Sequence, residues 1–164
     1  RYKSSYSWKQ IDRMSRAVAD RLTEQITSVI GLSRGGLVPA TIVANHLNIR
    51  NVYSIGLASY ELDPNNNIHI HKHDVYQQIP LDSPCMLKGE TVLIVDDISD
   101  RGVTFQHVMQ TYMAKADCNV ITMSLFIKPE TIYIPDYYHK SVSQDEWITF
   151  PWEKKVVAQK ESTS

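Results

Sequence analysis

Three aspartates, a glycine and a threonine follow an apolar run near the middle of the chain, in the segment VLIVDDISDRGVT at 92–104. Gly102 lets the backbone approach a phosphate closely or adopt a positive φ angle. Thr104 and the first N–H groups of a following helix can donate hydrogen bonds to phosphate oxygens, and the positive end of the helix dipole adds to the attraction. The segment therefore predicts a loop that binds a phosphorylated ligand.

The aspartates of this segment predict contacts with a cation or with sugar hydroxyls. Asp96 and Asp97 are adjacent carboxylates that repel each other, so we expect them to bind ribose hydroxyls, directly or through Mg²⁺. Asp100 is a candidate general base or charge stabiliser. The alternative is that these acids only cap the helix that follows. One of the three can do that, but three acids together with Gly102 and Thr104 favour ligand binding.

A second candidate phosphate site follows an earlier apolar run, at Ser33-Arg34-Gly35-Gly36. The glycines expose backbone N–H groups, and Arg34 supplies positive charge and a planar guanidinium. These features suit a pyrophosphate. The alternative is that Arg34 is a surface residue in a turn between a strand and a helix.

Two helices are predicted before the middle of the chain. Ser7 and Gln10 form the pattern of a capping box, and apolar residues then recur at helical spacing, which predicts a helix over 8–25. Pro39 is tolerated in a first helical turn, and the residues up to Leu47 continue a second helix. A third helix follows the acidic segment, with one apolar face formed by Phe105, Val108, Met109, Tyr112 and Met113.

Apolar runs between these helices predict strands over 28–32, 52–60, 91–95, 120–127 and 137–142. Strands that alternate with helices indicate an α/β fold with a central parallel sheet covered on both faces. In such sheets ligands bind beyond the carboxyl ends of the strands. The segments 33–36 and 96–104 are therefore expected to meet at one crevice.

The composition sets bounds on the class of protein. A chain of 164 residues favours a single domain over 1–164, and it can bury a core without disulfides. The net charge of −1 gives no indication of nucleic-acid binding, and no apolar run reaches the length of a membrane span. Cys85 and Cys118 have no C-x-x-C spacing and are typical of reduced thiols in a cytoplasmic protein.

The segment 92–104 resembles the donor-binding motif of the type I phosphoribosyltransferases. That motif is an apolar strand, two acids, two variable residues, a small or acidic residue and then usually Thr-Gly-x-Thr. The matching residues are Asp96, Asp97, Asp100, Gly102 and Thr104. Arg101 replaces the usual Thr or Ser, so a hydroxyl for the 5′-phosphate is missing. A guanidinium could pair instead with that phosphate or with a neighbouring acid.

Three further segments are similar to those of the bacterial xanthine-guanine phosphoribosyltransferases. IGLSRGGLVP at 30–39 resembles the pyrophosphate loop of that family, and FIKP at 126–129 its purine-contacting lysine segment. WITFPWE at 147–153 resembles its base-binding segment. With the donor motif these matches occur in family order and span roughly 8–153.

The resemblance implies a single-domain type I phosphoribosyltransferase fold with a small hood. It also implies transfer of phosphoribosyl from 5-phosphoribosyl-1-pyrophosphate to guanine, xanthine or hypoxanthine, with Mg²⁺ as cofactor. Homo-oligomers, dimers or tetramers, are expected by the same resemblance, as is a cis peptide near Ser33–Arg34. The implied donor-binding residues are Ser33, Arg34, Gly35, Asp96, Asp97, Ser99, Arg101, Gly102, Val103 and Thr104. The implied purine-binding residues are Lys128, Trp147, Ile148 and Glu153, with Asp100 catalytic and Asp97 a ligand of Mg²⁺, directly or through water.

The purine-binding residues have chemistry that suits a 6-oxopurine. Lys128 can donate to the exocyclic oxygen, which disfavours adenine, although a solvated lysine at a strand end is the alternative. Trp147 offers a flat apolar face for a purine ring, although it could equally be a core aromatic, as could Trp152. By resemblance, backbone groups near Ile148 and an acid near Glu153 contact the N1 and N2 edge of the base, with Glu in place of the usual Asp.

Residues of about 60–84 are expected, by resemblance, to form a mobile hood that closes over the site and excludes water. His69, His71 and His73 alternate within it. This spacing allows a metal site, but without acids or cysteines at a matching distance we interpret it as one polar face of a hairpin.

Two alternatives to a purine enzyme remain open at this point. Some proteins of this fold bind the donor without catalysis and regulate transcription, and Arg101 keeps this hypothesis open. Such regulators usually carry a DNA-binding extension or a basic face, and this chain shows neither. The second alternative is an enzyme with a pyrimidine acceptor, against which Lys128 and the segment 147–153 argue.

Overall fold

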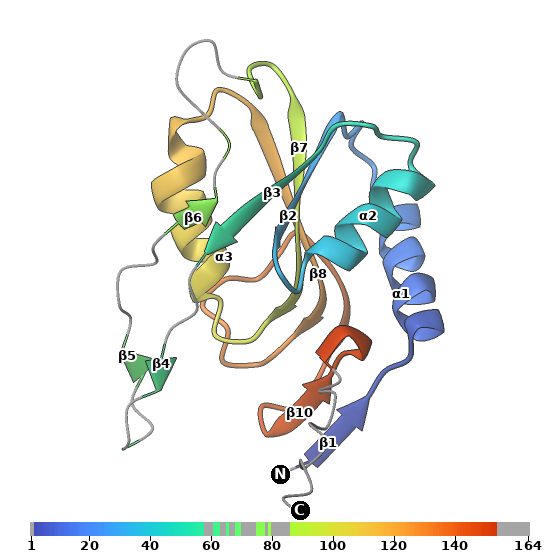
Figure 1. Ribbon diagram of the computed structural model, residues 1–164, viewed down its shortest axis with the longest axis vertical. Coiled ribbons are helices and arrows are strands. Elements are labelled where there is room, and N and C mark those ends of the chain that lie inside the picture. The colour runs from blue at the N-terminus through green and yellow to red at the C-terminus, as the bar shows by residue number, and fades with distance from the viewer. Residues whose placement is uncertain are drawn as a thin grey trace, which may run out of the picture.

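The computed structural model describes residues 2–57, 61–62, 65, 68–69, 75–77, 79 and 86–153 (Figure 1). Its main sheet has six strands in the order β6-β3-β2-β7-β8-β9. Their bounds are Val75–Gln77 (β6), Val52–Leu57 (β3), Ser28–Ser33 (β2), Thr91–Ser99 (β7), Asn119–Ile127 (β8) and Tyr137–Ser141 (β9). Neighbouring strands are parallel except at the edge, where β6 runs antiparallel to β3. The predicted parallel sheet is confirmed, with one antiparallel edge strand added.

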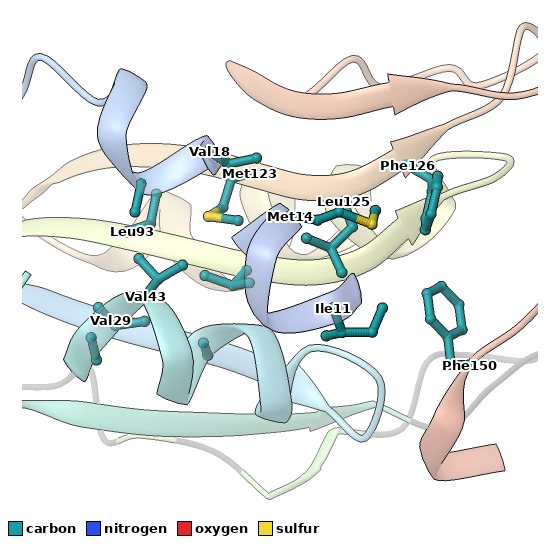
Figure 2. Packing of buried hydrophobic residues seen from close by; sticks show 14 of the residues in the cluster. Ile11, Met14, Val18, Val29, Val43, Leu93, Met123, Leu125, Phe126 and Phe150 are labelled. Carbon is teal, nitrogen blue, oxygen red and sulfur yellow. The ribbon is translucent and has the colours of Figure 1, made fainter. Parts of the chain in front are cut away.

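Helices cover both faces of this sheet (Figure 1). On one face, α1 (Trp8–Arg21) and α2 (Leu37–His46) pack against the central strands. Figure 2 shows this core, in which Ile11, Met14 and Val18 of α1 meet Leu93 and Met123 of the sheet. On the other face lie α3 (Val103–His107), a π-helical turn η1 (Val108–Tyr112) and a 3₁₀ turn η2 (Met113–Lys115). They cover a second core.

The first helix begins where the sequence predicts and ends earlier. Ser7 accepts a hydrogen bond from the backbone N–H of Gln10, whose side chain accepts one from the backbone N–H of Ser7, so the capping box is confirmed. The predicted end at residue 25 is wrong because Leu22 is extended, with ψ 125°. This turn directs the chain toward β2 and lets Ile26 enter the core.

The central strand is longer than predicted, and this changes where the acidic pair lies. Pairing of β7 with β8 continues past Val95, through Asp96 opposite Ser124 and up to Ser99 opposite Ile127. The prediction of a loop beginning at Asp96 is therefore wrong. Both aspartates belong to the carboxyl half of a strand that is held on one side by β8.

The helical stretch after Gly102 is continuous but irregular. Phe105, Val108, Tyr112 and Met113 are buried in the second core and Met109 packs against it, which confirms the predicted apolar face. The π-helical turn at Val108–Tyr112 was not predicted, because a widened turn changes the periodicity by only one residue.

A small parallel sheet joins the two ends of the described chain. It pairs β1 (Tyr2–Ser5) with β10 (Glu146–Thr149), and a 3₁₀ turn η3 (Pro151–Glu153) follows. This sheet lies at the end of the molecule toward which the central strands run (Figure 1).

Only parts of the expected hood belong to the described residues. They include β4 (Glu61–Leu62) and β5 (Ile68–His69), which pair antiparallel, and β6. The last residues of the predicted strand 52–60, the side chain of His69, and His71 and His73 lie outside the described residues. The hood and the reading of its histidines therefore stay predictions. Among the helices that the structure does describe, none has the length and apolar character that crossing a membrane requires.

Candidate active site

The two loops singled out in the sequence meet at the carboxyl edge of the sheet. They follow β2 and β7, which are neighbours in the strand order. The contact is close, because a Cβ placed on Gly35 would lie 2.1 Å from Oδ2 of Asp97. Only a glycine leaves the space that this carboxylate occupies. The peptide bond between Ser33 and Arg34 is cis, as expected.

A cavity with a volume of about 580 Å³ lies at this edge. It is lined by Asp96, Asp97, Ile98, Ser99, Asp100, Gly102, Thr104, Phe105, Trp147 and Glu153. Acidic and hydroxyl groups from β7 and α3 form one part of the lining, and an aromatic ring and an acid from the last described residues form another. The volume falls within the range of a small-molecule site.

The acidic pair is half-buried at this edge of the sheet. Burial, and then repulsion from Asp97, raise the pKa of Asp96 well above its usual value. Burial raises the pKa of Asp97 to about 6, and the charge of Glu153 adds to this rise. One oxygen of each carboxylate accepts a local backbone hydrogen bond, from Asp97 N at 2.9 Å and from Ile98 N at 2.7 Å respectively. The two adjacent carboxyls therefore favour a positive charge beside them.

These pKa values predict that the ligand-free protein loses stability as the pH rises. A carboxyl whose pKa is higher in the folded than in the unfolded chain binds more protons when folded, so the free energy of unfolding falls as pH rises from about 4 through the folded pKa. For Asp97 this window ends at about pH 6. Asp96→Asn removes one charge of the pair and keeps an oxygen for the Asp97 N–H.

We expect Asp96→Asn to raise the melting temperature near pH 7.5 in the absence of divalent cations and to flatten its fall between about pH 4 and pH 7.5. Thermal unfolding followed by circular dichroism across this range measures both effects. Asp117→Asn, at an exposed acid, is the matched control. A pH dependence of Asp96→Asn equal to that of the wild type would contradict the assignment.

A second, smaller cavity of about 180 Å³ adjoins the first and shares Asp100 and Trp147 with it. It also contains Lys128, whose side chain is 8% exposed and whose Nζ lies 3.6 Å from Oδ2 of Asp100. The same Nζ donates to the backbone carbonyl of Gln144 at 3.3 Å. Lys128 is therefore a buried cation beside Asp100, and not the solvated strand-end lysine that was the alternative.

The segment after β9 brings the last group of predicted residues to the cavity. Trp147 and Glu153 line it, whereas the side chain of Ile148 is buried in the first core. Pairing with β1 fixes the position of β10, because Ser4 lies opposite Ile148. The Ser4 hydroxyl also donates a hydrogen bond to Oε1 of Glu146 at 2.5 Å. Trp152 stacks on Phe150 with ring centroids 4.8 Å apart and packs against the first core. This agrees with the alternative in which Trp152 is a core aromatic.

Gly102 and Arg101 lie next to each other before α3 but line different cavities. Gly102 has φ 79°, in the region that favours glycine, and a Cβ there would lie 2.5 Å from the backbone nitrogen of Tyr133. Arg101 is exposed and lines the smaller cavity with Glu130 and Glu146 instead of the larger one. Of the two partners considered for its guanidinium, a phosphate or an acid, this placement brings it toward acids.

The structure gathers most of the predicted residues, but not all, around the larger cavity. Eight line it: Asp96, Asp97, Ser99, Asp100, Gly102, Thr104, Trp147 and Glu153. Arg101 and Lys128 line the smaller one. Ser33 is the last residue of β2, and Arg34 and Gly35 belong to the turn that follows. Val103 is the first residue of α3, and the side chain of Ile148 lies in the first core. Gln144 was missed, because a glutamine in a turn has no sequence signal that links it to Asp100.

Comparison with known proteins identifies the class to which this fold and site belong. The model of the phosphoribosyl transferase domain matches residues 3–159. The chain belongs to the phosphoribosyl transferase domain family. The expected type I α/β fold is thereby confirmed.

Similar proteins narrow this class to the purine phosphoribosyltransferases. A xanthine-guanine phosphoribosyltransferase of Idiomarina loihiensis is 34% identical over 149 residues, which cover 90% of this chain and 84% of that protein. A protein of the same name from Cereibacter sphaeroides is 38% identical over 156 residues, with the same coverage. The crystal structure of a purine phosphoribosyltransferase from Pyrococcus horikoshii has a TM-score of 0.70 at 30% identity and covers 96% of this chain and 99% of its own. The expected resemblance to the purine phosphoribosyltransferases is confirmed.

Proposed function

We propose that this protein transfers the phosphoribosyl group from 5-phosphoribosyl-1-pyrophosphate to a 6-oxopurine and releases pyrophosphate, as an enzyme of purine salvage. The observation that carries the proposal is the larger cavity, in which the carboxyl end of β7 and the start of α3 share one space with Trp147 and Asp100. A cavity of this kind suits a donor at one part and a planar acceptor at another. The names of the relatives support the same reaction.

The donor is proposed to lie along the carboxyl ends of β2 and β7. Thr104 and the backbone around Gly102 would bind its 5′-phosphate, with Ser99 and Val103 forming the rest of this loop. Asp96 and Asp97 would bind the ribose hydroxyls, and Arg34, with the N–H groups of Ser33 and Gly35, the pyrophosphate. Arg101 is left at the edge of this loop, where it lines the smaller cavity together with Glu130 and Glu146.

The acidic pair fits Mg²⁺. Two desolvated carboxylates without a cationic partner among the described side chains form a hard oxygen donor set, and Mg²⁺ is commonly held by one or two carboxylates together with substrate phosphates. Asp97, directly or through water, would hold the ion beside Asp96. When bound, the ion supplies charge neutralisation for the leaving pyrophosphate.

The acceptor is proposed to stack on Trp147, with Lys128 at its 6-oxo group and the Ile148 backbone and Glu153 at its N1 and N2 edge. In the reaction the bond from C1′ to the pyrophosphate oxygen breaks and a bond from N9 to C1′ forms. The pyrophosphate leaves with the electron pair, and Asp100 accepts or shares the proton of N7. Expected oligomerisation, a cytoplasmic location and a hood closing from residues 60–84 remain predictions.

Purine-dependent release of pyrophosphate tests the function. We expect release with guanine, xanthine or hypoxanthine in the presence of the donor and Mg²⁺, and much less with adenine or with pyrimidine bases. Donor binding without release on any base would favour the regulatory alternative and overturn the enzyme. Release only with a pyrimidine would overturn the acceptor.

Lys128→Met gives a further prediction about the acceptor. The substitution keeps an unbranched apolar side chain and removes a charged hydrogen-bond donor. A hydrogen bond from a charged group contributes about 1.5–3 kcal/mol. We expect the KM for a 6-oxopurine to rise on the order of 10- to 100-fold. The donor KM should change little, because Lys128 does not line the larger cavity. Initial rates at varied base and varied donor measure both, and an unchanged purine KM would contradict the role.

A further inference from the structure

Gln144, in the turn between β9 and β10, connects the proposed catalytic aspartate to the base-binding segment. Its side-chain Nε2 lies 3.2 Å from Oδ1 of Asp100, and its Oε1 accepts the backbone N–H of Glu130 at 3.0 Å. Its backbone carbonyl accepts from Lys128 Nζ. One residue thus contacts the strand end that carries Asp100, the buried lysine and the loop after β8.

The contacts of the amide fix which way it points. A backbone N–H can only donate, so the atom of Gln144 that faces Glu130 N must be the oxygen. The NH₂ group then faces Asp100 and donates to its carboxylate. The reversed amide would place two donors together at Glu130 and two acceptors together at Asp100, so the alternative orientation is excluded by both ends at once.

The hydrogen bond from Gln144 matters for Asp100 because few other contacts restrain its carboxylate. Its side chain is 43% exposed, and its other described polar partner is Lys128, 3.6 Å from Oδ2. Lys128 is the residue proposed to bind the 6-oxo group of the purine. With Lys128 engaged by the base, the hydrogen bond from Gln144 to Oδ1 is the described contact that would hold the carboxylate in place.

We propose that Gln144 is a positioning residue for the phosphoribosyl transfer: it orients the carboxylate of Asp100 toward the purine. The inference rests on the proposed function, in which Asp100 accepts the purine proton. Gln144 lines the smaller cavity but not the larger one, so it acts on the proton-accepting group without contacting the donor site. A displacement of about 1 Å in a reacting group can cost on the order of 100-fold in rate.

The test compares Gln144→Glu, Gln144→Ala and the control Gln25→Glu, an identical chemical change at an exposed residue that precedes β2 on the opposite edge of the sheet. Glu at position 144 keeps an oxygen for the Glu130 N–H and replaces the donor to Asp100 by a second carboxylate. A purely structural glutamine therefore predicts that Gln144→Glu is milder than Gln144→Ala. A positioning role predicts that Gln144→Glu is at least as damaging.

We expect Gln144→Glu to lower kcat on the order of 10- to 100-fold with the KM for the donor within about twofold of wild type. Gln25→Glu should match the wild type, and a melting temperature for each variant reports folding. Wild-type kcat in Gln144→Glu, or a raised donor KM with kcat unchanged, would overturn the role of Gln144 and leave the proposed function standing. A wild-type chain that turns over no purine would overturn both.

Discussion

Asp100→Asn is expected to lower kcat for purine phosphoribosylation by about 10²- to 10⁴-fold, the usual contribution of a general base. The amide has the same shape as the carboxylate but does not accept a proton at neutral pH. Asp100 lines both the larger cavity and the cavity of Lys128, as Trp147 does, so its carboxylate lies where donor and acceptor would meet. Initial rates of pyrophosphate release measure the loss.

Donor binding should survive this substitution. Asp96, Asp97 and Thr104 carry the proposed donor contacts, and Asp100 lies three residues beyond the acidic pair. Titration calorimetry with the donor and Mg²⁺ should therefore give a Kd within a few-fold of the wild type. Asp117→Asn is the control for the loss of one negative charge. Turnover of Asp100→Asn at the wild-type rate would remove the proposed base from the account.

Gly35→Ala should damage function more than folding. The added methyl would lie 2.1 Å from Oδ2 and 2.5 Å from Cγ of Asp97, so that carboxylate must move out of the position it holds beside the turn after β2. We expect the donor affinity in the presence of Mg²⁺ to fall on the order of 10- to 100-fold, because Asp97 is proposed to hold the ion and a ligating carboxylate displaced by about 1 Å would no longer match it. Titration of the donor at fixed Mg²⁺ measures this.

The neighbouring glycine provides a matched comparison. A Cβ on Gly36 would lie 2.1 Å from the backbone carbonyl oxygen of Val95, which belongs to a central strand and has little freedom to move. Gly36→Ala should therefore lower the free energy of unfolding by about 1–3 kcal/mol, the usual effect of overpacking, whereas Gly35→Ala should lower it less. Equal donor affinity in Gly35→Ala and wild type would show that Asp97 does not hold the donor as proposed.

The sequence predicted the fold well because its signals are local. Buried parallel strands appear as short apolar runs, and Ser7 with Gln10 marks the beginning of α1 within four residues of chain. The errors have tertiary causes. The acidic pair was assigned to a loop because Asp96 and Asp97 are polar, yet pairing with β8 carries β7 on to Ser99. Pairing with a neighbouring strand therefore outweighed the low strand propensity of the two aspartates.

The site was predictable where chemistry is concentrated in one segment. Asp100, Gly102 and Thr104 lie within five residues, so their spacing could be read directly. Gln144 could not be found this way, because it lies 44 residues from Asp100 along the chain and its type is common in exposed turns. The pairing of β1 with β10, which supports Trp147, is hidden for the same reason, since it joins residues more than 140 positions apart.

The placement of Arg101 changes what its replacement of a hydroxyl residue means. From the sequence alone, this residue kept open the hypothesis of a donor-binding regulator without activity. In the structure Arg101 is exposed and lines the smaller cavity, while Gly102 and Thr104 still line the larger one. The substitution therefore leaves the proposed phosphate-binding groups in place, and the similarity to named enzymes supports catalysis.

We propose that this protein transfers phosphoribosyl to a purine base and does not merely release it from its donor. The most direct test is the stoichiometry of a reaction containing the wild-type chain, the donor, Mg²⁺ and one 6-oxopurine. Chromatography should find one purine nucleoside 5′-monophosphate for each pyrophosphate released, and no product when the base is omitted. Pyrophosphate formed together with free ribose 5-phosphate, and without nucleotide, would contradict the account.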